Sequence, residues 1–151
     1  MAIACTQPPD YPDEPIISFK SMSKNTLRQG SLIGPGADSL LMTISFTDGD
    51  GDLGDEGNLN PISNIYLIDE RINDTLLPQT IPFIPIQGAG NGISGDMSFV
   101  VFPSCCIHLG QACEVFEDYP VDTVLYSIVI QDRAGNFSNR VQANPILLLC
   151  Q

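Results

Sequence analysis

The chain has 151 residues, of which 43% are hydrophobic, and this size and composition suit one globular domain. Six Lys and Arg residues stand against 18 Asp and Glu residues, so the formal net charge is −12. Such a charge repels phosphate backbones and anionic lipid headgroups, and nucleic acid is therefore not an expected partner. The sequence has no long apolar run, so we expect no transmembrane helix.

The first 15 residues predict an anchor and a tether. Ala2-Ile3-Ala4-Cys5 resembles the end of a bacterial lipobox, in which the cysteine carries the lipid. The charged and apolar parts of a signal peptide do not precede it, so we expect the chain to begin partway through the leader. Residues 6–15 are rich in proline and acids, which favours an extended spacer. We therefore predict lipidation of Cys5, a folded domain over residues 16–151, and membrane contact through the lipid alone.

From residue 16 onward, alternation of apolar and polar residues predicts about seven short strands, and no segment has a helical period. The clearest strand is 39–47, where Leu40, Met42, Ile44 and Phe46 share one face. Prolines interrupt 80–86, which suits an edge strand. In chain order, the expected strands cover residues 17–22, 39–47, 64–69, 80–86, 93–102, 123–131 and 141–149.

These short strands, separated by clusters of Gly, Pro, Asn and Asp, predict an all-β fold, an antiparallel β-sandwich. We expect an immunoglobulin-like (Ig-like) topology, although another Greek key would produce the same pattern. In an Ig-like sandwich, the loops that follow strands 39–47 and 123–131 meet at one pole. The connection that follows strand 93–102 then lies at the opposite pole, and so does the end of the last strand.

Two segments of the chain combine acids, glycines and asparagines, namely Phe46-Thr-Asp-Gly-Asp-Gly-Asp-Leu-Gly54 and Ile130-Gln-Asp-Arg-Ala-Gly-Asn-Phe-Ser-Asn139. Together they resemble the paired signatures of small outer-membrane lipoproteins of the Bacteroidetes type. Residues 12–19 are also similar to the segment that follows the lipidated cysteine in that family. The resemblance implies an Ig-like fold, export, and attachment to the outer membrane at the cell surface or periplasmic face, and it implies no reaction. The cysteine-rich stretch 105–113 departs from the family pattern.

The first of these segments predicts a metal site. Its acids alternate with glycines or follow them closely, and they are Asp48, Asp50, Asp52 and Asp55. Carboxylates on a tight glycine-rich turn can converge on one hard cation, and Ca²⁺ fits because it takes six to eight oxygen ligands. An EF-hand is excluded, because its sixth and twelfth positions fall on Leu53 and Leu59. The alternative is a solvated acidic turn without a metal.

The second segment, Asp132-Arg133-Ala134-Gly135-Asn136, predicts a turn in which Gly135 adopts a positive φ. Because the two loops meet in an Ig-like sandwich, Asp132 is expected beside Asp48 and Asp52. Three roles remain open. Asp132 completes the calcium shell, Arg133 neutralises the acids, or Asp132 caps a plain turn.

Five cysteines predict two disulfides, which imply an oxidising compartment, with Cys5 left over for the lipid. Cys105, Cys106 and Cys113 lie in the connection between strands 93–102 and 123–131, at the pole where Cys150 ends the last strand. A bridge between the neighbours Cys105 and Cys106 would be strained. We therefore expect Cys113 to pair with one of the two and Cys150 with the other, with the choice between them open.

The sequence offers no catalytic constellation. His108 is the only histidine, and neither a nucleophile elbow nor a phosphate-binding loop accompanies it. We expect a non-catalytic accessory lipoprotein, an Ig-like subunit that docks onto a larger outer-membrane or cell-envelope protein and carries a structural calcium site. The alternative is a free-standing surface adhesin or carbohydrate-binding module that uses the loop pole.

Overall fold

A computed structural model describes residues 10–29, 38–54, 64–76, 79–82, 84 and 92–150. This part of the chain contains strands and no helix. The strands are β1 (Ile16–Met22), β2 (Thr26–Arg28), β3 (Leu40–Asp48), β4 (Ile65–Asp69), β5 (Asp74–Thr75), β6 (Ile93–Val101), β7 (Ile107–His108), β8 (Gln111–Ala112), β9 (Val121–Val124), β10 (Tyr126–Ile130), β11 (Val141–Gln142) and β12 (Ile146–Leu149).

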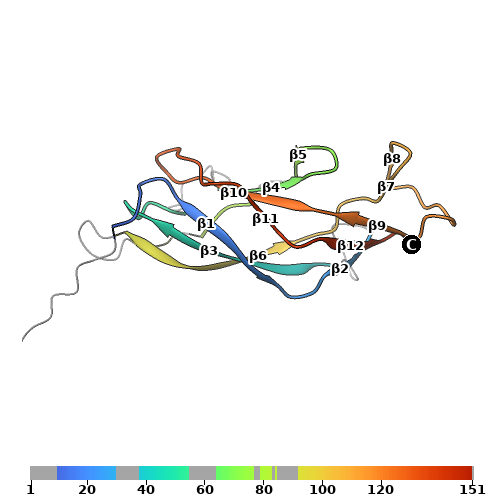
Figure 1. Cartoon of the computed structure of the whole chain (residues 1–151), viewed down its shortest axis with the longest axis horizontal. Helices are drawn as coiled ribbons and strands as arrows, with labels where there is room; N and C mark the ends of the chain where they lie inside the picture. Colours follow the sequence, from blue (N-terminus) through green and yellow to red (C-terminus); the bar gives the residue numbers. More distant parts are fainter. Residues whose placement is uncertain are drawn as a thin grey trace, which may run out of the picture.

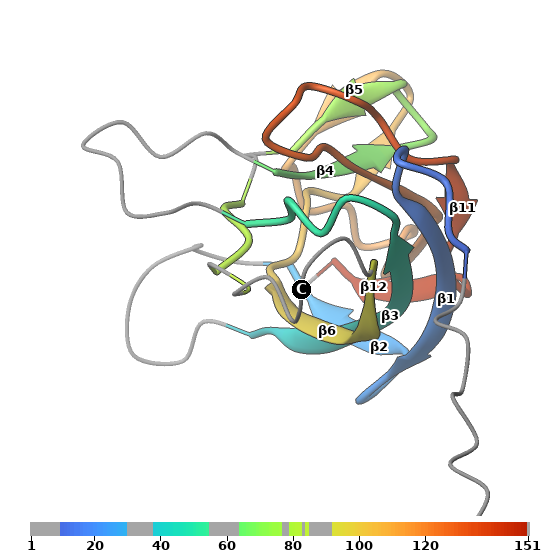
Figure 2. The ribbon, with the colours of Figure 1, turned by 90° about the vertical axis from the view of Figure 1, so that its left-hand side faces the viewer.

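The strands form a two-layered sandwich, elongated along the strand direction (Figure 1). One layer has the strand order β1-β3-β6, and the other has the order β11-β10-β4-β5. A further sheet, β2-β12-β9, continues the second layer, because β9 runs into β10 and β11 into β12 after short breaks. Figure 2 looks along the long axis and shows β4 and β5 across from β3 and β6. This division of the strands between two layers confirms the predicted all-β, Ig-like sandwich.

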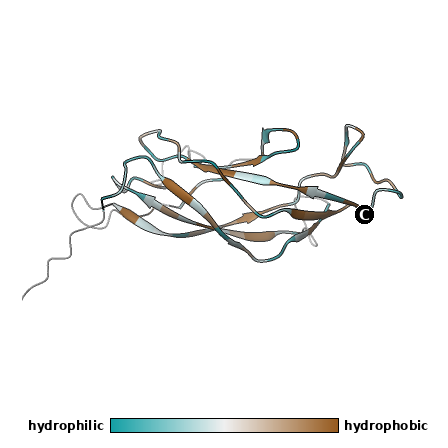
Figure 3. Ribbon diagram, viewed as in Figure 1, coloured by the Kyte–Doolittle hydropathy of each residue, from teal (hydrophilic) through white to brown (hydrophobic). Residues whose placement is uncertain are grey.

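The sandwich is held together by the side chains that the period-two pattern directs inward. On β3, Leu40, Met42, Ile44 and Phe46 are buried, as the alternation predicted. On β10, Tyr126, Ile128 and Ile130 are fully buried and belong to the same core cluster. Figure 3 shows the hydrophobic colour concentrated on the strands and the hydrophilic colour on the connections at both ends. Burial of these side chains is the main stabilising contribution, since each is worth about 1.5–3 kcal/mol.

The N-terminal segment takes part in both layers. β1 pairs antiparallel with β3, with Ile17 opposite Phe46. After a short turn, β2 pairs with β12 of the other layer in parallel, with Leu27 opposite Leu148. The sequence did not predict β2, because three residues are too few to show a period.

Three expected strands differ from the structure. The strand expected over 80–86 is not found as a strand among its described residues, which contain only a single bridge residue at Pro82. Gln79, just before this range, forms an isolated bridge with Ile65, and residues 83, 85 and 86 lie outside the described part. The strand expected over 123–131 starts earlier and divides at Leu125 into β9 and β10. The strand expected over 141–149 is interrupted at residues 143–145, between β11 and β12. The interruption includes Pro145, which has no N–H to donate to a ladder.

The connection between β6 and β9 is a disulfide-bonded insertion, as predicted. Within it, β7 and β8 form a small hairpin. Cys105 bonds to Cys113 across the hairpin base, and Cys106 bonds to Cys150, with Cα–Cα distances of 4.6 and 5.8 Å. The structure thus resolves the choice that the sequence left open. Burial gives the reason, because Cys106 faces the core beside Cys150 while Cys105 lies on the hairpin side.

The two poles of the sandwich therefore differ. Residues 10–15 enter at the left-hand pole of Figure 1, where β3 ends, and the β7–β8 hairpin and the C-terminal end of β12 lie at the right-hand pole. We call these the tether pole and the hairpin pole.

Candidate functional site

Asp48 is the last residue of β3 and has no exposed surface. The alternation that buries Leu40, Met42, Ile44 and Phe46 continues through it, so the strand directs a carboxylate into the interior at the tether pole. A fully buried carboxylate requires compensation by hydrogen bonds, an opposite charge or a metal ion.

Asp50 and Asp52 follow on the turn after β3. Gly51 between them has a φ of 72°, a left-handed conformation that glycine adopts without a steric cost. The turn folds back so that one carboxylate oxygen from each of Asp48, Asp50 and Asp52 lies within 4.8 Å of the others. The predicted convergence of these three acids is therefore found in the structure.

At this pole, buried acceptor oxygens lack hydrogen-bond partners. Within the described residues, four buried side-chain atoms have no hydrogen-bond partner, and all four are acceptor oxygens. They are both carboxylate oxygens of Asp48, Oδ1 of Asp52 and Oδ1 of Asn64. Asn64 directly precedes β4 and is held at this pole by the bond from its Nδ2 to the carbonyl of Gln131, at 3.1 Å. The three unpartnered oxygens of Asp48 and Asp52, for which the described residues supply no donor, leave a site suited to a cation.

The electrostatics of the cluster also favour a bound cation. Burial, together with the charges of Asp50 and Asp52, raises the pKa of Asp48 to about 7. Burial also raises the pKa of Asp52, with further contributions from the charges of Asp132 and Asp50. The protein thus concentrates carboxylates where their ionised forms are unfavourable in the absence of a cation.

The two expected loops meet at this pole. The backbone N–H of Ala134 donates to Oδ2 of Asp52 at 2.8 Å, and the N–H of Arg133 donates to the carbonyl of Asp52 at 3.3 Å. Asp132 is buried and accepts bonds from the backbone N–H and the side-chain Nδ2 of Asn136, at 2.7 and 2.8 Å. Asp132 therefore caps its own turn, and its charge still acts on Asp48 and Asp52.

The remaining predictions at this pole have mixed outcomes. Gly135 has the expected positive φ, 96°. Arg133 donates from Nη1 to the carbonyl of Gly54 at 3.1 Å, which places its charge beside the acidic turn. Asp55 and Cys5 lie outside the described residues. Sequence reasoning missed Asn64, because a single asparagine before a strand carries no recognisable signal.

The donor set suits a hard cation such as calcium. It consists of carboxylate oxygens, and no histidine or cysteine belongs to the cluster among the described residues. Hard oxygen ligands on an irregular turn suit Ca²⁺, which tolerates flexible geometry, whereas zinc prefers nitrogen and sulfur ligands.

The acid cluster directly adjoins the end of the tether. The N–H of Gly49 donates to the carbonyl of Pro12 at 2.8 Å. A Cβ at Gly49 would lie 2.3 Å from the carbonyl oxygen of Tyr11, so only glycine permits this approach. Residue 49 therefore fixes residues 11–12 against the turn that carries Asp48, Asp50 and Asp52.

At the hairpin pole, a buried ionic network was not foreseen from the sequence. The guanidinium of Arg71 pairs with Asp69, which is 1% exposed at its side chain, and with Asp122 of β9. Arg71 also donates to the hydroxyl of Ser104 at 2.8 Å. Asp122 accepts the backbone N–H of Ile107 at 3.0 Å, which ties the network to the hairpin. The network joins β4, β9 and the insertion, and acts as a structural connection.

Next to this network lies an apolar pocket of about 460 Å³ between β4, the end of β6 and the hairpin. Its walls include Leu67, Leu76, Val101 and Ile107. The Arg71 guanidinium at its edge is already engaged by Asp69, Asp122 and Ser104. The pocket therefore offers apolar contact rather than a charged anchor.

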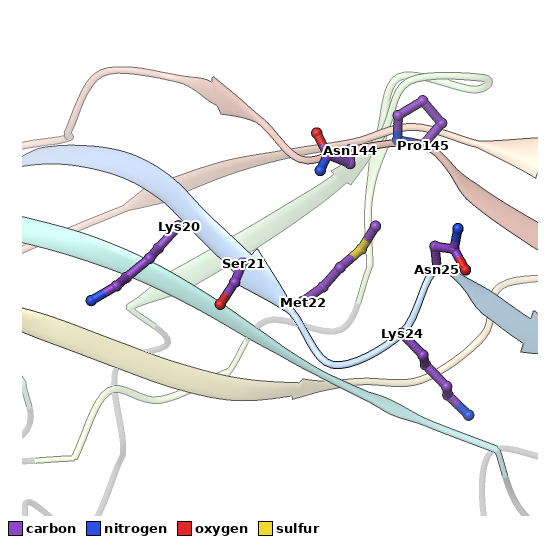
Figure 4. Close-up of a pocket in the computed structure, with 7 residues that line it drawn as sticks. All are labelled: Lys20, Ser21, Met22, Lys24, Asn25, Asn144 and Pro145. Carbon is purple, nitrogen blue, oxygen red and sulfur yellow. The ribbon is translucent and has the colours of Figure 1, made fainter.

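A second hollow, of about 610 Å³, is an open depression where the chain passes from β1 to β2 (Figure 4). It carries two ammonium groups, those of Lys20 and Lys24, which Figure 4 shows on opposite sides of Met22. Each is paired with an acid, Lys20 with Asp96 and Lys24 with Asp38. The two lysines are thus already neutralised, and this depression does not present an anion site.

His108 lies in an aromatic cluster on the hairpin. Its ring stacks on Tyr119 with the centroids 4.2 Å apart, and the Phe116 centroid lies at 5.0 Å. These contacts give the side chain a packing role.

In the described part of the chain, no helix is long and apolar enough to cross a membrane. Comparison with protein-family models, with curated proteins and with solved structures finds no match for this chain.

Proposed function

We propose that this protein is a non-catalytic accessory lipoprotein of the cell envelope, tethered through a lipid at Cys5, whose tether pole binds a structural calcium ion. The observation that carries the proposal is the fully buried carboxylate of Asp48, with both oxygens unpartnered, beside the point where the tether meets the domain.

We propose calcium because it would both bind the unpartnered oxygens and stabilise the ionised carboxylates at this pole. It supplies the missing partner of Asp48 and Asp52, and its charge favours the ionised forms that burial opposes. Asp50 completes the converging set of carboxylates. Asn64 and Asp132 are additional oxygen sources at the same pole, and Asp55 remains a predicted ligand.

The position of the site suggests what the ion does. Asp48 directly precedes Gly49, whose N–H donates to the carbonyl of Pro12. The backbone of Gly92 also packs closely on this turn, because a Cβ at residue 92 would lie only 2.6 Å from the Asp48 carbonyl oxygen. An ion bound to Asp48, Asp50 and Asp52 stiffens this junction, so the proline-rich spacer ends on a fixed support. The domain then keeps a defined orientation relative to its lipid.

A tethered domain of this kind acts by contact with another protein. The net charge of −12 disfavours anionic membranes and nucleic acids as partners. Its sole histidine is packed between aromatic rings, which supports a role without catalysis. We propose that the partner is a larger outer-membrane or envelope protein, held by the surface that points away from the lipid.

The calcium site is tested by thermal melting of the purified chain in chelator, in millimolar calcium and in millimolar magnesium. An ion that binds only the folded state stabilises it by about 2.7 kcal/mol at 100 times its Kd, or roughly 5–10 °C in Tm for a chain of this size. Magnesium, which holds its water more tightly and requires a near-octahedral shell, should raise the Tm less. Identical melting curves in chelator and calcium would leave the acidic turn as a solvated turn without a metal.

The accessory role is tested by co-purification of the full-length gene product from its native membranes. A stoichiometric complex with one envelope protein supports it. Binding of the isolated domain to glycans or matrix proteins, without such a complex, would instead support a free-standing adhesin or carbohydrate-binding module.

A further inference from the structure

The tip of the β7–β8 hairpin has a conformation that does not suit its sequence. His108 pairs with Gln111, so Leu109 and Gly110 are the two central residues of the turn. Their φ angles are 50° and 79°, which makes the turn one that normally carries Asn-Gly. Glycine meets this requirement freely, but in the left-handed region the Cβ of a leucine crowds the following carbonyl oxygen. Leu109 is therefore strained where it stands.

The fold gains no packing in return for this strain. Leu109 is 87% exposed, the highest exposure of any large hydrophobic residue in the described part of the chain. Burial is the source of hydrophobic stabilisation, so a leucine that remains in water contributes almost none. A strained, exposed apolar residue suggests a contact outside the chain.

The hairpin presents this residue rigidly. The Cys105–Cys113 disulfide closes its base, and the N–H of Cys113 donates to the carbonyl of Cys106 at 3.0 Å. Beside the tip, the His108 ring stacks on Tyr119. A side chain held in one position loses little freedom when it binds, which is the advantage of a preorganised contact.

The surroundings of Leu109 determine which kind of partner fits. Val115, 63% exposed, adds a second apolar side chain on the same insertion. The exposed charged residues that follow on the insertion are acidic, namely Glu114, Glu117 and Asp118, and no Lys or Arg occurs from residue 107 to residue 120. An apolar tip on an acidic insertion is repelled by anionic lipid surfaces and favours a protein pocket with a basic rim.

The position of the β7–β8 hairpin in the domain is compatible with a protein partner. The hairpin lies near the pole opposite residues 10–15 and projects sideways from the long axis (Figure 1), so it lies far from the surface to which the lipid would attach the domain. This step rests on the proposed function, which supplies the lipid anchor and the docking role.

We propose that Leu109 is the apolar anchor through which this domain docks onto its envelope partner, and that it inserts into a pocket with a basic rim on that protein. The anchor is a single side chain at the tip of a disulfide-closed hairpin, on an insertion that also carries the exposed acids Glu114, Glu117 and Asp118.

The test uses the substitution Leu109→Asn, because asparagine tolerates the left-handed conformation and a folding defect is therefore not expected. The matched control is Phe137→Asn, which removes another large exposed apolar side chain, 56% exposed, at the tether pole. Leu109→Met preserves apolar bulk. Each variant is expressed as the full-length gene product in its native host, its Tm is measured, and its stoichiometric envelope complex is purified and quantified.

We expect Leu109→Asn to keep or raise the Tm while reducing the recovered complex at least tenfold. Phe137→Asn should recover the wild-type amount, and Leu109→Met should recover most of it. Undiminished complex with Leu109→Asn would overturn the anchor and leave the accessory role intact, whereas the absence of a complex for every variant would overturn both.

Two further measurements exclude other occupants of the tip. The purified wild-type domain should not sediment with phosphatidylcholine vesicles and should remain monomeric in analytical ultracentrifugation. Vesicle binding or self-association that Leu109→Asn abolishes would replace the protein partner with a lipid surface or a second copy, and would overturn the proposal.

Discussion

The substitution Asp48→Asn should stabilise the protein in chelator, and calcium should remove most of this advantage. Asparagine has nearly the same shape as aspartate but carries no charge. In the folded protein without metal, the pKa of Asp48 is raised from 3.8 to about 7. A shift of about 3 units corresponds to about 4 kcal/mol at 1.36 kcal/mol per unit, which is an upper bound because the turn can relax.

The sign follows from linkage. Because the folded pKa lies above the unfolded value, the contribution of Asp48 to the stability of the metal-free protein is fully present below about pH 4 and is lost as the pH rises through about 7. Asp48→Asn removes this contribution to the pH dependence, so at pH 8 in chelator the variant should be more stable by up to about 4 kcal/mol. In calcium at 100 times the Kd, the wild type gains about 2.7 kcal/mol, a figure that already includes the relief of repulsion, and the variant loses this gain. The advantage of the variant should therefore fall from up to about 4 kcal/mol in chelator to about 1 kcal/mol in calcium.

The assay is urea denaturation of both proteins at pH 8, in chelator and in calcium, and again in chelator at pH 5. Asp118→Asn serves as the control, since Asp118 is an exposed acid at the other pole and its replacement should change stability equally under all conditions. If Asp48→Asn destabilises the protein in chelator, the carboxylate has an internal partner, and if calcium leaves the difference between the two proteins unchanged, Asp48 is not a ligand. Either result would refute the reasoning.

Three other changes have defined expectations. Cys150→Ser opens a disulfide that links residues 44 positions apart, and chain entropy predicts a loss of about 4 kcal/mol in denaturant titration under non-reducing conditions. Arg71→Met leaves the buried Asp69 without its counter-charge and should cost about 3–5 kcal/mol, whereas Lys20→Met, at an exposed pair, should cost less than about 1 kcal/mol. Mass spectrometry of the gene product should find a diacylglyceryl group on Cys5, and an unmodified thiol there would remove the anchor from the proposal.

The sequence predicted those features that depend on local patterns. Period-two alternation located β3 and the inward face of Leu40, Met42, Ile44 and Phe46, because a half-buried strand imposes that period on its side chains. The Ig-like topology placed Cys150 near the insertion and brought the turn containing Asp52 to the one containing Ala134. Both inferences combined a short motif with a rule about which loops share a pole.

Features set by tertiary contact were not predictable in this way. Neither the pairing of β2 with β12 nor the network around Arg71 leaves a periodic trace in the sequence. The burial of Asp48 could have been found by extending the alternation of β3 one step further, but the Asp-Gly pattern suggested a solvent-exposed turn. Asn64 could not have been found, because its unpartnered oxygen depends on where β4 meets Gln131.

The N-terminal segment crosses from one layer to the other between β1 and β2, and this crossing determines how the domain bears tension. A pull on the tether enters at Ile16 and acts along β1, whose hydrogen bonds to β3 lie across the direction of force. These bonds share the load in shear and do not open one at a time. Beyond the crossing, β2 passes the force to β12, and Cys106–Cys150 carries it covalently into the insertion. A domain held by a lipid at one pole and by a partner at the hairpin would thus be loaded along its most resistant axis.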